Sequence, residues 1–143
     1  LAYERQLGVV KRLSECRVRL RAPRPAIVYQ RLNLPVIADR DFTIKVTWGE
    51  RGGALWASYQ TANQHGPLAR SGIVRVETFE GGWLLWPVDG GKATRARYQM
   101  RLDLAGSLPR WLARSGAGKE MPELYRSIRQ LLPKIRAPGE GKR

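Results

Sequence analysis

The chain has 143 residues and lacks several features that would assign it to a class at once. Cys16 is its single cysteine, so no disulfide can form within the chain, and we expect a buried or half-buried thiol there, with no nearby His to make it a nucleophile. His65 is its single histidine and has no cluster of Cys, Asp or Glu at ligand spacing, which argues against a metal site and a catalytic triad. No apolar run approaches the roughly 18 residues of a membrane-spanning helix.

The sequence motifs of enzymes are missing too. The Gly-rich stretches lie at expected turns and contain no Walker or dinucleotide-binding pattern. The 12 acidic residues form no pair that suggests acid–base catalysis. We therefore expect no enzyme, with no catalytic residue, no metal ion and no cofactor. No signal-peptide pattern is visible, and because the chain opens on Leu1 rather than Met, its compartment stays open.

Lysine and arginine are plentiful, since 26 of them against 12 acidic residues give a net charge of +14. This balance favours polyanionic partners, either an anionic membrane surface or a nucleic acid. The excess is spread evenly along the chain without a block of five or six like charges, which is typical of a solvated basic surface. Because the pattern shows no aromatic residues stacked among the arginines, we expect transient contact with anionic membranes rather than nucleic-acid binding.

Alternation of apolar and polar residues predicts about seven β-strands. The clearest is 42–48, where Phe42, Ile44, Val46 and Trp48 share one face. Residues 94–102 alternate as cleanly, with arginines on one face and apolar side chains on the other. The remaining predicted strands are 17–21, 26–34, 55–61, 73–79 and 82–88. Short links between them predict an antiparallel sheet.

Helical patterns stand at both ends of the chain. Residues 2–13 predict a weak helix. After Gly106 the apolar period changes from two to three or four, and one continuous stripe runs from Met121 to Ile135. This stripe must pack on the apolar face of the sheet because no other element can cover it. The prediction is an α+β fold, a curved antiparallel sheet packed on a long C-terminal helix.

A series of short motifs then resembles one family, the START domains, which are lipid-transfer modules related to the steroidogenic acute regulatory protein. The motifs are, in order, YQRLNLP at 29–35, DRDF at 39–42, PLARSGIVR at 67–75, Gly82-Trp83 with Leu85 and Pro87, Thr94 with Tyr98, and GSLPRWL at 106–112. Their order and spacing over residues 10–132 carry the resemblance. It implies a helix-grip fold, in which the sheet grips the final helix and an apolar ligand tunnel lies between them.

The resemblance also implies a division of the chain and a function. Residues 1–136 would form about the C-terminal two thirds of a START-like lipid-binding domain, and residues 137–143 a disordered basic tail. The implied function is binding, with transfer, of a lipid or another apolar small molecule. The residues that would line the ligand space are Arg40, Phe42, Ile44, Val46, Tyr98, Met100, Leu124 and Ile128.

Other interpretations remain open at this point. The inward strand residues and the stripe on the helix could form an ordinary packed core. Arg40 could make a structural ion pair with Asp39 or Asp41 instead of contacting a ligand. Trp56 lies where the resemblance implies a membrane-contacting loop, but it could be an ordinary strand residue. A polyketide cyclase or aromatase of the same wider fold is the alternative function, which a polar tunnel with convergent titratable groups would favour.

Overall fold

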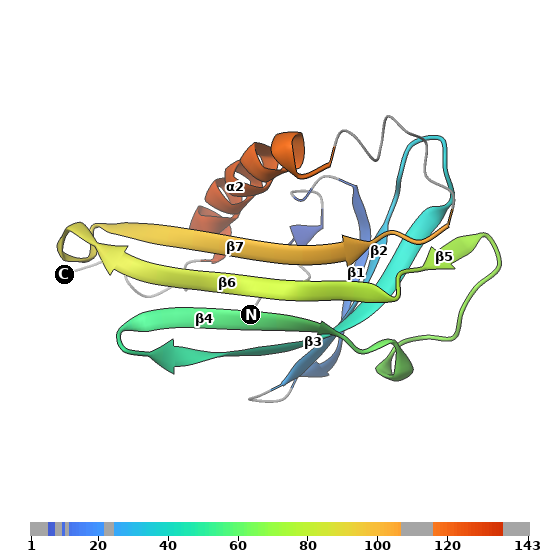
Figure 1. Ribbon diagram of the computed structural model, residues 1–143, viewed down its shortest axis with the longest axis horizontal. Helices are drawn as coiled ribbons and strands as arrows, with labels where there is room; N and C mark the ends of the chain where they lie inside the picture. Colours follow the sequence, from blue (N-terminus) through green and yellow to red (C-terminus); the bar gives the residue numbers. More distant parts are fainter. Residues whose placement is uncertain (1–5, 8–9, 11, 22–24, 107–115, 136–143) are drawn as a thin grey trace.

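The computed structural model of the chain describes residues 6–7, 10, 12–21, 25–106 and 116–135. Its elements, in chain order, are β1 (Leu13–Arg21), β2 (Ala26–Leu32), β3 (Asp39–Arg51), β4 (Ala54–Thr61), η2 (Asn63–His65), β5 (Ile73–Arg75), β6 (Thr78–Val88), η3 (Asp89–Gly91), β7 (Ala93–Asp103) and α2 (Gly116–Ile135) (Figure 1). In this part of the chain, no helix combines the length and the apolar character needed to cross a membrane.

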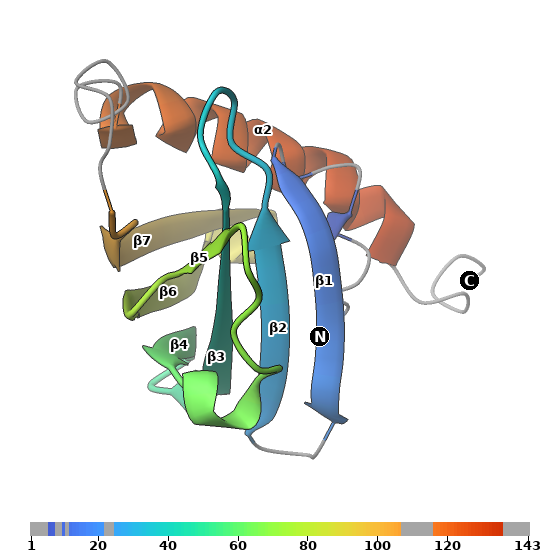
Figure 2. The ribbon, with the colours of Figure 1, turned by 90° about the vertical axis from the view of Figure 1, so that its right-hand side faces the viewer.

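The strands form one curved sheet that faces α2. Its order is β1-β2-β3-β4-β6-β7, and each of these neighbours is antiparallel to the next. Figure 2 shows α2 crossing the open side of this sheet, from the side of β7 toward β1. The predicted α+β fold, with a curved antiparallel sheet and a C-terminal helix, is confirmed.

Some predicted boundaries are wrong. The strand expected at 73–79 is two strands, because β5 leaves the main path and pairs in parallel with the start of β3, Asp39 opposite Ile73. The short helix expected at 2–13 cannot extend to its predicted end, because Leu13 begins β1. Most of that helix, the predicted start of the final helix at 107–115 and the tail 137–143 lie outside the described residues.

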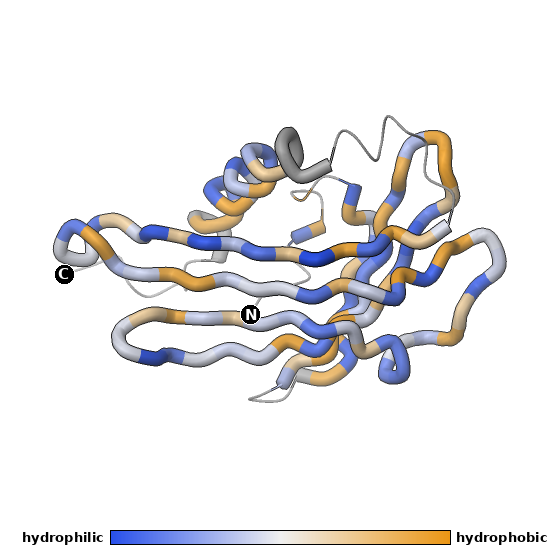
Figure 3. The backbone as a smooth tube through the Cα atoms, viewed as in Figure 1, coloured by the Kyte–Doolittle hydropathy of each residue, from blue (hydrophilic) through white to orange (hydrophobic). Residues whose placement is uncertain are grey.

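The buried core lies against the inner face of β1, β2 and β3, where apolar positions are frequent (Figure 3). The inner face is the face that includes Phe42, Ile44 and Val46, each at most 3% exposed. Cys16 lies in the same cluster at 4% exposure, so the expectation of a buried thiol is confirmed. In β7, hydrophilic positions recur along the strand, as its alternation predicts (Figure 3).

The glycine pair Gly81-Gly82 lets the backbones of neighbouring strands approach in the middle of β6. A Cβ at Gly81 would lie 2.1 Å from the Gln99 carbonyl oxygen, and one at Gly82 would lie 2.2 Å from the Ala57 carbonyl oxygen. Gly81 also has φ +158, at the edge of the region that favours glycine. Paired glycines within a strand are typical of a bend, which here accompanies the curvature of the sheet.

We predict that Gly82→Ala lowers the free energy of unfolding by about 3 kcal/mol, because the new methyl group would collide with backbone rather than with a movable side chain. Denaturant unfolding followed by circular dichroism measures this. Ser58→Ala is the matched control, because Ser58 lies opposite Gly82 on β4 and its change should stay within about 0.5 kcal/mol. Equal stability of the two variants would contradict the close approach of Gly82 to the backbone of β4.

Candidate functional site

The antiparallel register of β2 and β3 positions the first group of predicted site residues. Val28 lies opposite Ile44, and Ala26 lies opposite Val46. Directly opposite residues of an antiparallel pair point to the same side, so these side chains all face inward. Phe42 belongs to the same face and stacks on Phe79 of β6, with ring centroids 4.5 Å apart. The structure thus places three predicted site residues together in the buried core.

Arg40 begins this inward row and is only 2% exposed. Its guanidinium donates hydrogen bonds to the backbone carbonyls of Ala38, Leu104 and Ala105. The two neighbouring carboxylates are engaged elsewhere, Asp39 with Arg31 and Asp41 with Arg75. A buried cation needs such acceptors. Arg40 therefore connects the start of β3 to the segment that follows β7.

A second aromatic group lies where α2 meets the sheet. Trp83 of β6 packs against Tyr98 of β7 with ring centroids 4.5 Å apart. Tyr125 of α2 meets Trp83 edge-on at 5.7 Å, and its hydroxyl donates a 3.4 Å hydrogen bond to the Ala96 carbonyl. These contacts hold the helix over β6 and β7.

Tyr98 is a half-buried phenol within this group. Its hydroxyl donates to the sulfur of Met100 at 3.1 Å. Burial raises the pKa of Tyr98 to about 12, because the phenolate would lose hydration. Tyr98 is thus a neutral hydrogen-bonding group at ordinary pH.

Burial falls steeply across the inner face. On β3, Phe42, Ile44 and Val46 are buried and Trp48 is half-buried, whereas Met100 of β7 is 42% exposed and Leu55 of β4 is 53% exposed. Both face inward by register, since Met100 lies opposite Gly81 and Leu55 lies opposite Leu85. The half of the face formed by β4, β6 and β7 is therefore apolar but only partly covered.

The two predicted residues of α2, Leu124 and Ile128, are half-buried. They belong to the apolar stripe that also includes Leu131, which is 8% exposed, whereas neighbouring Leu132 is 51% exposed. The helix itself is confirmed, and the stripe is buried or half-buried at Leu124, Ile128 and Leu131 but not at Leu132. Whether its residues contact a ligand stays a prediction.

An open pocket of about 320 Å³ lies at one end of the inner face, beside the tips of the β3–β4 and β6–β7 hairpins. These two hairpin tips lie at the same end of the sheet (Figure 1). It is lined by Glu50, Gly53, Leu55, Leu85, Pro87 and Thr94. None of these lining residues was among the ligand-contacting residues expected from the sequence. Alternation did indicate the apolar strand positions. It could not indicate that residues from two separate hairpins would line one open pocket.

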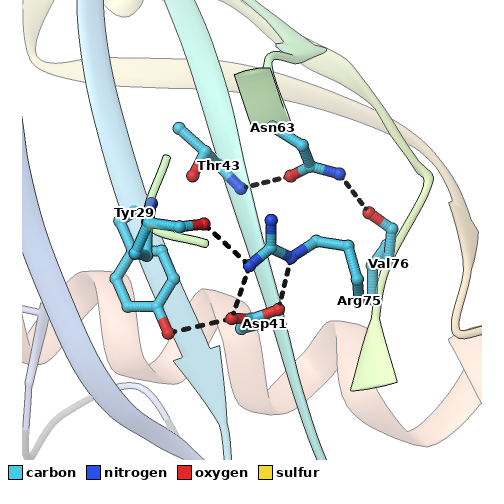
Figure 4. A network of polar contacts seen from close by, with 7 residues as sticks. Tyr29, Asp41, Thr43, Asn63, Arg75 and Val76 are labelled. Atoms are coloured by element: carbon cyan, nitrogen blue, oxygen red, sulfur yellow. Dashed lines mark hydrogen bonds and ion pairs between the residues drawn. The ribbon is translucent and has the colours of Figure 1, made fainter. Parts of the chain in front are cut away.

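A polar network on the outer face fixes β3 from the other side (Figure 4). Asp41, 2% exposed, accepts two hydrogen bonds from Arg75, at 2.6 and 3.1 Å, and one from the Tyr29 hydroxyl at 3.1 Å. Arg75 also donates to the Pro67 carbonyl. The network therefore ties the segment around Pro67 and the strand β5 to the back of β3.

Asn63 completes this attachment. Its amide oxygen accepts from the Thr43 backbone N–H, and its amide nitrogen donates to the Val76 carbonyl, both at 2.8 Å. Burial, with a smaller contribution from nearby Asp41, raises the pKa of Tyr29 to about 12. The hydrogen bond to Asp41 raises the pKa of Arg75. Sequence reasoning missed this network, because its members come from four separate segments.

No metal site is evident among the described side chains, where no three His, Cys, Asp or Glu residues are grouped as ligands. His65 lies exposed in η2. Trp56 is a residue of strand β4 and is 36% exposed on the outer face. The titratable groups on the inner face of the described strands, Cys16, Arg40, Glu50, Tyr59 and Tyr98, are distributed over four strands.

The model of the START domain family matches residues 17–137. The STAR-related lipid transfer protein from Xanthomonas axonopodis (fragment 25–204) has a similar structure, with a TM-score of 0.79 and 20% identity over 92% of this chain and 74% of that one. None of the curated proteins gives a match.

Two human structures are similar as well. Human STARD10 gives a TM-score of 0.77 at 19% identity, covering 94% of this chain and 55% of that one. Human StAR-related lipid transfer protein 5 gives 0.72 at 13% identity, covering 95% of this chain and 64% of that one. The chain thus spans less than two thirds of either human chain. At such identities the likeness establishes the shared fold and no more.

We predict that Asp41→Ala lowers the free energy of unfolding by about 3 kcal/mol, because it leaves the guanidinium of Arg75 without its buried carboxylate partner. Asp39→Ala is the control, since it removes a more exposed ion pair with Arg31 and should cost less than about 1 kcal/mol. Denaturant titrations of the two variants compare them. If Asp39→Ala lowered the free energy of unfolding as much as Asp41→Ala, the buried pair of Asp41 with Arg75 would not be the more important of the two.

The raised tyrosine pKa values predict that stability is lost in alkali. Folded Tyr29 and Tyr98 ionise near pH 12 and the unfolded phenols near 10, so their contribution is complete below pH 10 and falls as the pH rises to about 12. Denaturant unfolding between pH 9 and 12 should show this decline, and Tyr98→Phe should make it shallower. A Tyr98→Phe curve parallel to that of the unmodified protein would count against burial of this phenol.

Proposed function

Because the chain belongs to the START domain family, we propose that it binds a lipid or another apolar small molecule between the inner face of its sheet and α2. Two of the similar structures are themselves named lipid transfer proteins, which supports this class of ligand. We include transfer of the bound molecule between membranes in the proposal, together with an absence of catalysis.

The observation that carries the proposal is the partly covered apolar surface on β4, β6 and β7. Met100 and Leu55 face inward yet are 42% and 53% exposed. Burial of apolar surface contributes about 25 cal/mol per Å² to the free energy of binding. An acyl chain or a ring system on this face would therefore be bound mainly through the apolar surface that it buries. The fully enclosed residues of β3 would form the floor of the site rather than its contact surface.

Individual residues would then have different roles. Phe42, Ile44 and Val46 would close the floor, while Tyr98 and Met100 line the contact surface on β7. Leu124 and Ile128 would cover the ligand from α2. Arg40 and the Tyr98 hydroxyl are the polar groups available to orient an oxygen-bearing ligand. Since Arg40 already binds three carbonyls, it would contribute only through its remaining N–H donors.

The net charge of +14 supports transient contact with anionic membranes, from which such a ligand would be taken. Nucleic acid remains the less favoured partner. The cyclase or aromatase alternative gains no specific support, because the described inner face is mainly apolar and its titratable groups are spread over separate strands.

The decisive experiment measures uptake of a fluorescent phospholipid or fatty acid by delipidated protein. Met100→Lys should weaken uptake at least roughly tenfold, because it introduces a charge into the apolar contact surface. Gln99→Lys is the matched control, since this exposed neighbour points to the outer face of the same strand and should leave uptake unchanged.

Circular dichroism would establish that both variants are folded. Failure of the unmodified, delipidated protein to extract either lipid from vesicles would refute the proposed function. Equal uptake by the two lysine variants would show that the inner face of β7 is not the contact surface.

A further inference from the structure

The outer face of the sheet combines tryptophans with arginines near the hairpin tips. Trp56 of β4 lies opposite Leu84 of β6, and Leu84 lies opposite Arg97 of β7. Two residues closer to the tip of the β6–β7 hairpin, Trp86 lies opposite Arg95. Because side chains at every second position share a face, these five residues form one surface, which we call the Trp–Arg surface.

The apolar and charged members of this surface differ in exposure. Arg95 and Arg97 are exposed, Trp56 is 36% exposed, and Leu84 and Trp86 are half-buried. A Cβ at Gly49 would meet three indole atoms of Trp56 at 2.9 to 3.0 Å, so the ring of Trp56 covers this glycine. Trp56 is therefore packed against the sheet on one side while the residue keeps solvent exposure, and Trp86 is half-buried beside it.

None of the five residues of the Trp–Arg surface is acidic. Glu50 lines the pocket on the inner side, and Asp89 lies in the turn η3. Glu80, which shares the outer face, lies opposite Arg101, farther from the tips than Arg97. The Trp–Arg surface is thus locally positive among the described residues, and it is complementary to an anionic partner.

We infer that the Trp–Arg surface docks the protein on anionic phospholipid membranes. Indole rings favour the boundary between headgroups and acyl chains, and cations near an anionic leaflet each add attraction. A nucleic acid binds by stacking its bases on aromatic ring faces, and the packing of Trp56 on Gly49 leaves at most one face of that ring for a base. This inference rests on the proposed function, since it identifies the surface through which the lipid-binding protein would meet its lipid source.

The open pocket lies on the opposite side of the same strand segments as the Trp–Arg surface. Leu55, Leu85 and Pro87, which line it, are sequence neighbours of Trp56, Leu84 and Trp86 and point to the opposite side of the same strand segments. Docking by the outer face would therefore bring the open end of the inner face within one sheet thickness of the membrane. A lipid would have a short path around the hairpin tips into the site.

The test is flotation of the protein with phosphatidylcholine vesicles that either contain or lack phosphatidylserine. The unmodified protein should float only with the anionic vesicles. The double variant Arg95→Glu/Arg97→Glu should bind them at least roughly thirtyfold more weakly, from the loss of two cations. The control, Arg126→Glu/Arg129→Glu, makes the same change in net charge at exposed positions of α2, on the other side of the sheet, and it should bind far more nearly like the unmodified protein.

A second measurement reports on the tryptophans. Brominated phospholipid in anionic vesicles should quench part of the tryptophan fluorescence, and Trp56→Phe with Trp86→Phe should remove most of that quenching while the other three tryptophans remain. These conservative changes keep aromatic side chains in place, so the fold should be retained.

Binding of a fluorescent fatty acid without vesicles separates this inference from the proposed function, because both charge variants should retain it. Loss of that binding in the unmodified protein, with flotation intact, would refute the ligand site and leave the docking surface standing. The inference is overturned if the unmodified protein ignores phosphatidylserine or if both charge variants lose flotation equally. It is also overturned if Arg95→Glu/Arg97→Glu loses binding to a single-stranded oligonucleotide but not to vesicles.

Discussion

The register of β3 is the constraint on which the rest of this structure depends. A slip of one residue in its pairing with β2 would exchange the two faces of the strand, because side chains alternate with a period of two. Arg40, Phe42, Ile44 and Val46 would then face outward, and Asp41 would enter the apolar core. The buried ion pair of Asp41 with Arg75 opposes this slip from the outer side, while apolar packing opposes it from the inner side.

The inner face of the sheet is buried in one half and partly exposed in the other, and this difference relates to the proposed function. Around β1, β2 and β3 the inner face is closed by side chains and stabilises the fold. Around β4, β6 and β7 the face remains apolar but partly exposed, with an open pocket at the hairpin tips. A site for an apolar molecule needs both parts, because the closed half supplies rigidity and the open half supplies surface that a ligand can cover.

Much of the candidate site follows from local pattern. Alternation along 42–48 and 94–102 correctly assigned the faces of β3 and β7, and the spacing of three and four correctly indicated the stripe on α2. The pairing of Arg40 could not be obtained this way. Its carbonyl partners at 104 and 105 are more than 60 residues away, and adjacent Asp39 and Asp41 are the partners that sequence proximity favours.

By itself, the sequence determined the α+β class, the strands and their faces, the amphipathic final helix and the resemblance to START domains, because these depend on short-range periodicity and motif order. Only the tertiary structure decided that β5 turns parallel to β3, that Asp41 and Arg75 meet, and that Trp56 and Trp86 share a surface with Arg95 and Arg97. These features depend on which strands become neighbours, a choice made by the packing of the whole chain and not encoded in any one segment.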